Sequence, residues 1–176
     1  NLMETTWKTW KEMYPDSRVL SGQTGFDYNY ENYPYGDYIS DHDLLLFPVS
    51  NTDDRLPGKE RVKGVIINGK AKAYRFNIGT NNTELFEDKF NNKDLIVVRD
   101  TDDNFILVFD QEGFENLQFS PVQNQLPVIM TDNEGNNWDV FGNAVSGPRT
   151  GQKLVGLTQF MGYWFAWAAF YPDIEL

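Results

Sequence analysis

Aspartates beside prolines and turns are the residues of this chain whose chemistry is easiest to state. Two carboxyl groups about 5 to 10 Å apart with different pKa values can hydrolyse a glycosidic bond. The candidates are Asp16, Asp53, Asp54 and Asp173. Carboxylates near turns also commonly hydrogen-bond their own backbone. We therefore assign no catalytic pair, and a carboxylate-based hydrolase acting on glycans stays an alternative function.

Acidic loops and a single histidine offer further candidates. Residues 100–104 and 132–136 carry alternating oxygen ligands, but Phe105 and Gln111 occupy two positions of the first loop where an EF-hand needs glycine and glutamate. His42 lies between two aspartates, and a solvated loop suits it better than a catalytic triad. We predict no metal site. Phosphate-binding loops and hydrolase motifs are absent from the sequence, so we also expect no cofactor.

A tyrosine-rich stretch is the stronger candidate for binding. Exposed aromatic faces stack on sugar rings, and polar groups beside them fix the orientation of the sugar. The predicted binding residues are Tyr28, Tyr30, Tyr33, Tyr35, Tyr38 and Arg55. Pro34 and Gly36 interrupt any regular element, so we expect an extended loop folded over the body of the domain. This stretch predicts a binding or structural module for a neutral small molecule or glycan. The alternative is that the rings only fill the surface of the core.

The pattern Trp-x-x-Trp-x-x-x-Tyr-Pro-Asp occurs near each end of the chain. Its structural residues are Trp7, Trp10 and Tyr14 in the first copy and Trp164, Trp167 and Tyr171 in the second. Positions i, i+3 and i+7 share one side of an α-helix, and the proline ends each helix. We predict short helices that end near residues 13 and 170, the second apolar all round and buried. Thr5 or Thr6, and Thr158, are the expected N-caps.

Between these helices the sequence predicts short antiparallel strands. Asn68-Gly69 between two apolar runs is a strong hairpin signal. Residues 95–99 and 105–109 flank a second turn, and further strands are expected at 44–49, 84–90, 114–119, 128–131 and 138–141. Strands without intervening helices indicate a mainly β fold, an antiparallel barrel or sandwich. A short N-terminal helix docks near it, and the aromatic C-terminal helix packs into it.

The composition limits the partners of the chain. A formal net charge of -11 opposes binding to nucleic acid and to anionic membranes, because both are bound through clustered lysine and arginine. The chain has no cysteine, which excludes disulfides and thiolate chemistry. Its apolar C-terminal helix is too short for a bilayer, which needs roughly 20 apolar residues, so we expect no transmembrane segment. The sequence does not indicate an oligomeric state.

Several motifs together resemble the bacterial domain-of-unknown-function family 3179. They are the two tryptophan signatures, Phe47-Pro48-Val49 with Asp54-Arg55-Leu56, Trp138-x-x-Phe141-Gly142, and Gly147-Pro148-x-x-Gly151. The resemblance covers nearly the whole chain and implies an internal duplication, in which each half ends with a double-tryptophan helix. On this basis residues 1–20 resemble the end of a preceding repeat whose earlier residues are removed or omitted. Residues 21–176 would form one β-rich domain with its terminal helix.

The resemblance also implies a place in the cell. Members of this family are usually secreted or lipoprotein-like, so we expect a periplasmic or cell-surface location. The family brings no function that can be carried over. A further alternative is therefore an interaction domain that a missing first repeat completes, and an exposed stripe on the first helix would be its mark.

Overall fold

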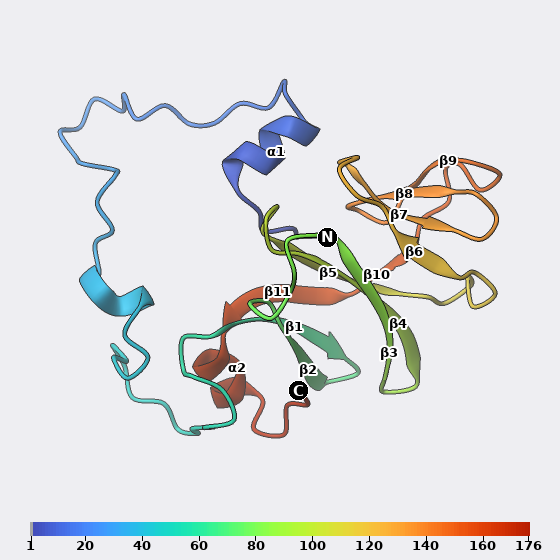
Figure 1. The fold of residues 1–176 in the computed structure, drawn as a ribbon. Helices are drawn as coiled ribbons and strands as arrows, with labels where there is room; N and C mark the ends of the chain where they lie inside the picture. The colour runs from blue at the N-terminus through green and yellow to red at the C-terminus, as the bar shows by residue number, and fades with distance from the viewer. Residues whose placement is uncertain (1) are drawn as a thin grey trace.

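The computed structural model describes residues 2–176, and its strands form three antiparallel sheets (Figure 1). The first sheet has the order β11 (Thr158–Tyr163), β1 (Arg61–Ile67), β2 (Lys70–Arg75). The second has the order β10 (Val155–Gly156), β5 (Phe105–Asp110), β4 (Lys93–Asp100), β3 (Glu84–Phe90). The third has the order β6 (Phe119–Pro121), β7 (Val128–Asp132), β8 (Asn137–Asp139), β9 (Ala144–Ser146). The mainly β prediction is confirmed, although no closed barrel is found among these residues.

The second sheet lies in the middle of the molecule because both of its faces are apolar. Successive side chains of a strand point to opposite faces. Ile96 and Val98 of β4 pack in one cluster with residues of the third sheet, such as Trp138. Leu95 and Val97 pack in another cluster with residues of the first sheet. β4 and β5 are therefore buried on both sides, and they hold the other two sheets in place.

The helices α1 (Trp7–Met13) and α2 (Trp164–Phe170) end where the sequence predicts. The Thr6 side chain caps α1 by accepting a hydrogen bond from the backbone N–H of Thr9. The prediction of Thr158 as the other N-cap is wrong, because Thr158 begins β11 and pairs with Ile66 of β1. Pairing with a neighbouring strand extends β11 up to the first turn of α2.

The terminal helix α2 covers the outer face of the first sheet. A Cβ atom at Gly64 of β1 would lie 2.0 Å from the indole of Trp167, and one at Gly162 of β11 would lie 2.8 Å from it. Two glycines on neighbouring strands thus let the indole lie directly on the sheet. The expectation that α2 is buried all round is wrong at Phe170, which is 83% exposed.

Most of the expected strands are present, and the exceptions share a cause. The hairpin at Asn68-Gly69 joins β1 to β2, and β3, β4, β5, β7 and β8 lie where strands were expected. Residues 44–49 form no strand, and residues 114–118 are turns that lead into β6. Phe47, in the first of these ranges, is 79% exposed. An apolar run becomes a strand only where a partner strand lies beside it. β9, β10 and β11 were not expected.

Candidate functional site

The tyrosine-rich segment runs outside the sheets rather than over them (Figure 1). Its only regular element is the 3-10 helix η1 (Gly36–Ile39). Four of its rings are between 45% and 61% exposed, namely Tyr28, Tyr30, Tyr33 and Tyr35. They lie in pairs, with 5.1 Å between the ring centroids of Tyr28 and Tyr30 and 5.7 Å between those of Tyr33 and Tyr35. These rings are therefore available to a ligand.

Lys59 ties the far end of this segment to the body. Its ammonium group lies 3.0 Å from the ring centroid of Tyr38 and 5.1 Å from that of Phe165, and it donates a 2.7 Å hydrogen bond to the carbonyl of Leu44. The backbone N–H of Lys59 donates to Nδ1 of His42. Lys59 is only 4% exposed, so this contact is a buried cation–π anchor. Tyr38 and His42 thus have structural partners.

Arg55 is engaged in a clamp rather than beside the tyrosines. Its guanidinium donates to both carboxylate oxygens of Asp53 and to the carbonyl of Ile174, and it lies 5.1 Å from the ring of Trp164. The indole of Trp164 donates in turn to the backbone carbonyl of Asp53. This clamp joins the loop before β1 to α2 and to the chain end. Tyrosine rings are not among the contacts of Arg55 within residues 2–176.

The four candidate aspartates do not form an acid and base pair in these contacts. Asp16, Asp54 and Asp173 are exposed. The hydrogen bond from Arg55 lowers the pKa of Asp53, which is the wrong direction for a general acid. Asp16 follows α1 and Asp173 follows α2, and Figure 1 shows these helices on different sides of the sheets. A hydrolase using these residues gains no support from this arrangement.

The acidic loops use their carboxylates for hydrogen bonds within the protein. Asp100 accepts from the hydroxyl of Thr83 and from the backbone N–H of Asp103. Asp132 accepts from Asn136 and from the indole of Trp138. Across the described part of the chain, no three His, Asp or Glu side chains are grouped so that they could hold a metal ion.

Two consecutive loops of the third sheet repeat one arrangement that the sequence reasoning missed. In Asp132-x-x-Gly-Asn136 the carboxylate accepts from the backbone and side-chain N–H groups of the asparagine, and Asp139-x-x-Gly-Asn143 does the same. The glycine has a positive φ in both loops. The signal was present as one pattern repeated after seven residues. These carboxylates stabilise turns, because each satisfies several donors.

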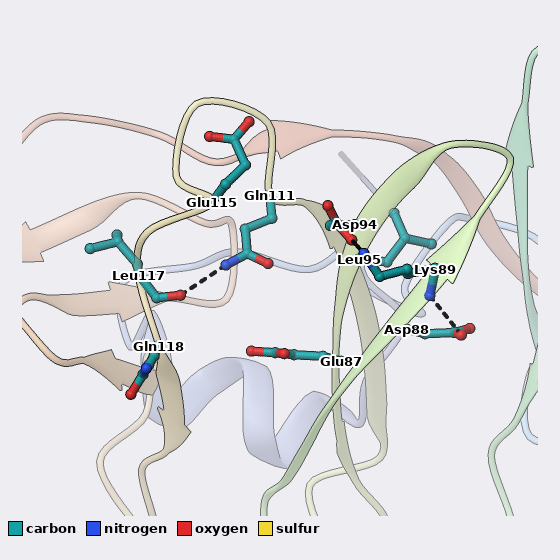
Figure 2. A pocket seen from close by; sticks show the side chains of 9 residues that line it. All are labelled: Glu87, Asp88, Lys89, Asp94, Leu95, Gln111, Glu115, Leu117 and Gln118. Atoms are coloured by element: carbon teal, nitrogen blue, oxygen red, sulfur yellow. Dashed lines mark hydrogen bonds and ion pairs between the residues drawn. The ribbon is translucent and has the colours of Figure 1, made fainter.

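A cavity of about 480 Å³ lies between the β3–β4 hairpin and residues 111–118 (Figure 2). Its lining is acidic: Glu87, Asp88, Asp94 and Glu115 contribute carboxylates, and Lys89 is the basic residue among them. Lys89 forms a 2.6 Å ion pair with Asp94. Leu95 and Leu117, which are 0% and 2% exposed, supply apolar surface. The cavity therefore offers mainly hydrogen-bond acceptors to a ligand.

Gln111 adds an amide to this cavity. The side chain is 6% exposed, and its amide nitrogen donates to the carbonyls of Phe114 and Leu117. Hydrogen bonding to the N–H of Gly113 is the main cause that lowers the pKa of Glu115, so that group stays ionised at neutral pH. Such a lining suits the hydroxyl groups of a sugar or an organic cation. Sequence reasoning missed it because pairing of β4 with β5 brings the two loops together.

One buried cation stands outside these candidate sites. Lys63 in β1 is 1% exposed, and burial lowers the pKa of its amine to about 8, while the charge of Glu4 opposes that shift. A buried amine is costly in its charged form unless a carboxylate pairs closely with it. At neutral pH the protonated amine therefore lowers the free energy of unfolding, because its charge lies between the first and second sheets.

We predict that Lys63→Met raises the free energy of unfolding at pH 7 by about 3 kcal/mol. The folded-state pKa, about 8, lies below the ordinary value of 10.5. The unfolded chain thus binds more protons between these values, and the wild-type protein becomes more stable as pH rises through them. Urea unfolding at a series of pH values would show this rise in the wild type and not in Lys63→Met. The exposed Lys70→Met is the control, and its stability should rise with pH as that of the wild type does. If the stability of Lys63→Met rose with pH by the same amount as that of the wild type, the assignment would be contradicted.

The comparisons with known proteins agree with the motifs of the sequence. A family model described as "Protein of unknown function (DUF3179)" matches residues 1–174, nearly the whole chain. The search of curated proteins and the search of solved structures found no match. Among residues 2–176 there is also no helix of the length and apolarity needed to span a membrane.

Proposed function

The chain belongs to the DUF3179 family of proteins of unknown function, and from that premise we propose that it is a non-catalytic binding module that acts outside the cytoplasm and recognises a neutral glycan. The observation that carries the proposal is the exposure of Tyr28, Tyr30, Tyr33 and Tyr35, which ranges from 45% to 61%. Exposed tyrosines give large contact areas for little loss of conformational entropy, because each has two rotatable side-chain bonds. The net charge of -11 favours a neutral ligand over an anionic one.

The anchor at Lys59 supports this proposal. The ring contacts continue from Tyr35 to Tyr38, at 6.4 Å between centroids, and from Tyr38 to Tyr163 of β11, at 6.5 Å. A row of aromatic rings thus leads from the segment to the first sheet. Binding along this row would order the segment and stabilise the fold by mass action.

We predict that one sugar in a panel of cellobiose, maltotriose, chitotriose and xylotriose raises the melting temperature by several degrees. At a hundredfold excess over Kd, binding stabilises a protein by about 2.7 kcal/mol. The double variant Tyr28→Ala, Tyr33→Ala removes one ring from each pair and should weaken binding about tenfold, measured by calorimetry.

The matched control places two changes in the acidic cavity, Glu87→Gln and Gln118→Ala, and should bind the sugar as the wild type does. Loss of binding in this control, with binding retained in the tyrosine variant, would move recognition to the acidic cavity and refute the role of the tyrosines. If none of the four sugars binds, glycan recognition itself is refuted.

A second candidate function is favoured by the difference between the two signatures. Trp164 and Ile174 are buried in the second copy, whereas Trp7 is 44% exposed and Leu20, beyond the first signature, is 99% exposed. After α2 the chain pairs with β2, since Ala73 donates to the carbonyl of Glu175 at 2.8 Å. The first copy has no such strand among residues 2–176. An interaction domain completed by a further sheet fits this difference, and replacing Trp7 and Trp164 in turn by alanine tests it.

A further inference from the structure

The acidic cavity beside the β3–β4 hairpin is lined by two kinds of carboxylate (Figure 2). Asp88 and Asp94 are already neutralised, because each lies 2.6 Å from the amine of a lysine. Glu115 accepts hydrogen bonds from backbone N–H groups. Neither Glu87 nor Glu115 forms an ion pair within the described part of the chain. The cavity therefore holds two negative charges that no cation of the protein balances.

A buried amide points into the same cavity. The side chain of Gln111 is 6% exposed, and its nitrogen Nε2 donates to the carbonyls of Phe114 and Leu117. These two bonds fix the amide, because the reverse orientation would place its oxygen against two carbonyl oxygens. Its oxygen Oε1 accepts no hydrogen bond within residues 2–176, yet the one fully enclosed side-chain atom without a partner there is Nε1 of Trp167. Oε1 is therefore an acceptor that is open to the cavity, and Figure 2 shows it on the side of the hairpin.

The charge and the spacing of these acceptors limit the class of ligand. A neutral hydroxyl group would satisfy Oε1 of Gln111 but would leave the two charges unbalanced. The carboxylates do not converge on a metal ion, since no three His, Asp or Glu side chains of the described residues are grouped to hold one. The ligand is then a cation larger than a metal ion, and the cavity of about 480 Å³ has room for it. An ammonium group suits all three acceptors, because it carries three N–H donors and no acceptor.

We infer that the acidic cavity is a binding site for an aliphatic diamine, which carries an ammonium group at each end of a short chain. Glu87 belongs to β3, whereas Gln111 and Glu115 follow β5, so the acceptors lie on two walls of the cavity. One ammonium group donates to Oε1 of Gln111 and to Glu87, and the other pairs with Glu115. Charge-assisted hydrogen bonds of this kind are the strong ones. The inference is independent of glycan recognition, since the cavity contains none of the tyrosines of residues 28–38.

Two amines of the same length test the inference by calorimetry on the whole chain. Cadaverine has an ammonium group at both ends, and hexylamine has a methyl group in place of one of them. Cadaverine should bind about tenfold more tightly, because hexylamine leaves one carboxylate without a partner. In an NMR titration, cadaverine should shift the side-chain amide signals of Gln111 and leave those of the exposed Gln23 unchanged. Equal affinity for the two amines, or no shift at Gln111, would overturn the inference.

Variants that remove one charge and keep the shape of the side chain complete the test. Glu87→Gln and Glu115→Gln should each weaken the binding of cadaverine about tenfold. Glu12→Gln is the matched control, because it removes the same charge from the exposed face of α1, and it should bind cadaverine as the wild type does. An equal loss in Glu12→Gln would mean that the net charge of -11 attracts the diamine, which would overturn the inference. Displacement of cadaverine by an equal concentration of Mg²⁺ would also overturn it.

Discussion

Trp164→Ala is expected to lower the free energy of unfolding by about 3 to 5 kcal/mol, the range for truncating a buried tryptophan. Trp164 is 0% exposed, and its cluster includes Leu56, Val62 and Ile174. Its indole also donates to the carbonyl of Asp53. The variant therefore loses apolar burial and leaves a partly buried acceptor without its donor. Urea unfolding monitored by circular dichroism measures the change.

Trp7→Ala is the matched control, because Trp7 holds the same position in the first signature. It is 44% exposed, so we expect a loss of less than about 1 kcal/mol. An equal loss in the two variants would mean that Trp7 is covered in solution. If that loss depended on protein concentration, it would favour the interaction domain over the glycan-binding module.

Asp132→Ala is expected to lower the free energy of unfolding by about 4 kcal/mol, because it leaves several buried donors without an acceptor. The carboxylate accepts from the backbone and the side chain of Asn136 and from the indole of Trp138, and both of these residues are 0% exposed. Asp132→Asn keeps one acceptor oxygen and should lose less. The exposed Asp102→Ala is the control and should change little. A loss of under about 1 kcal/mol in Asp132→Ala would contradict the role of this carboxylate.

The Asp132 carboxylate should also make the free energy of unfolding depend on pH in the acid range. Desolvation is the largest single influence on the pKa of Asp132 and raises it, but the hydrogen bonds from Asn136 and Trp138 outweigh it, so the pKa lies below the ordinary value of 3.8. A lowered pKa stabilises the fold above the ordinary value, and that stabilisation is lost as pH falls through the folded-state pKa. Urea unfolding between pH 5 and pH 2 should show a steeper loss in the wild type than in Asp132→Asn.

Local patterns sufficed for the elements whose signals lie within a few residues. The hairpin at Asn68-Gly69 followed from two residues that tolerate positive φ, and both have it, at 50° and 79°. The proline of each signature ended α1 and α2 as expected, because proline cannot continue a helix. Residues 44–49 have the composition of a strand but lack a neighbouring strand, and no local signal reveals that.

The candidate sites depended on contacts between distant residues. Arg55 was predicted as a binding residue from its neighbours in the sequence, yet it clamps Asp53 to the carbonyl of Ile174. The acidic cavity forms only because Gln111 follows β5, whose pairing with β4 brings residues 111–118 beside the β3–β4 hairpin. Periodicity and spacing describe one element at a time, so they do not contain this proximity.

The sequence by itself determined the mainly β class, the two aromatic helices and the family, since repeated spacing, turn residues and motifs are local properties of the chain. The sequence also indicated that the second helix is the buried one, because that helix is apolar all round. The tertiary structure alone decided which surface covers each copy of the signature. Trp164, the first residue of α2, is 0% exposed, whereas Trp7, the first residue of α1, is 44% exposed. The physical reason is that burial needs an opposing surface. The first sheet carries glycines where the second copy crosses it. The first copy packs Trp10, Met13 and Tyr14 against the cluster that includes Trp138 and leaves Trp7 at the surface.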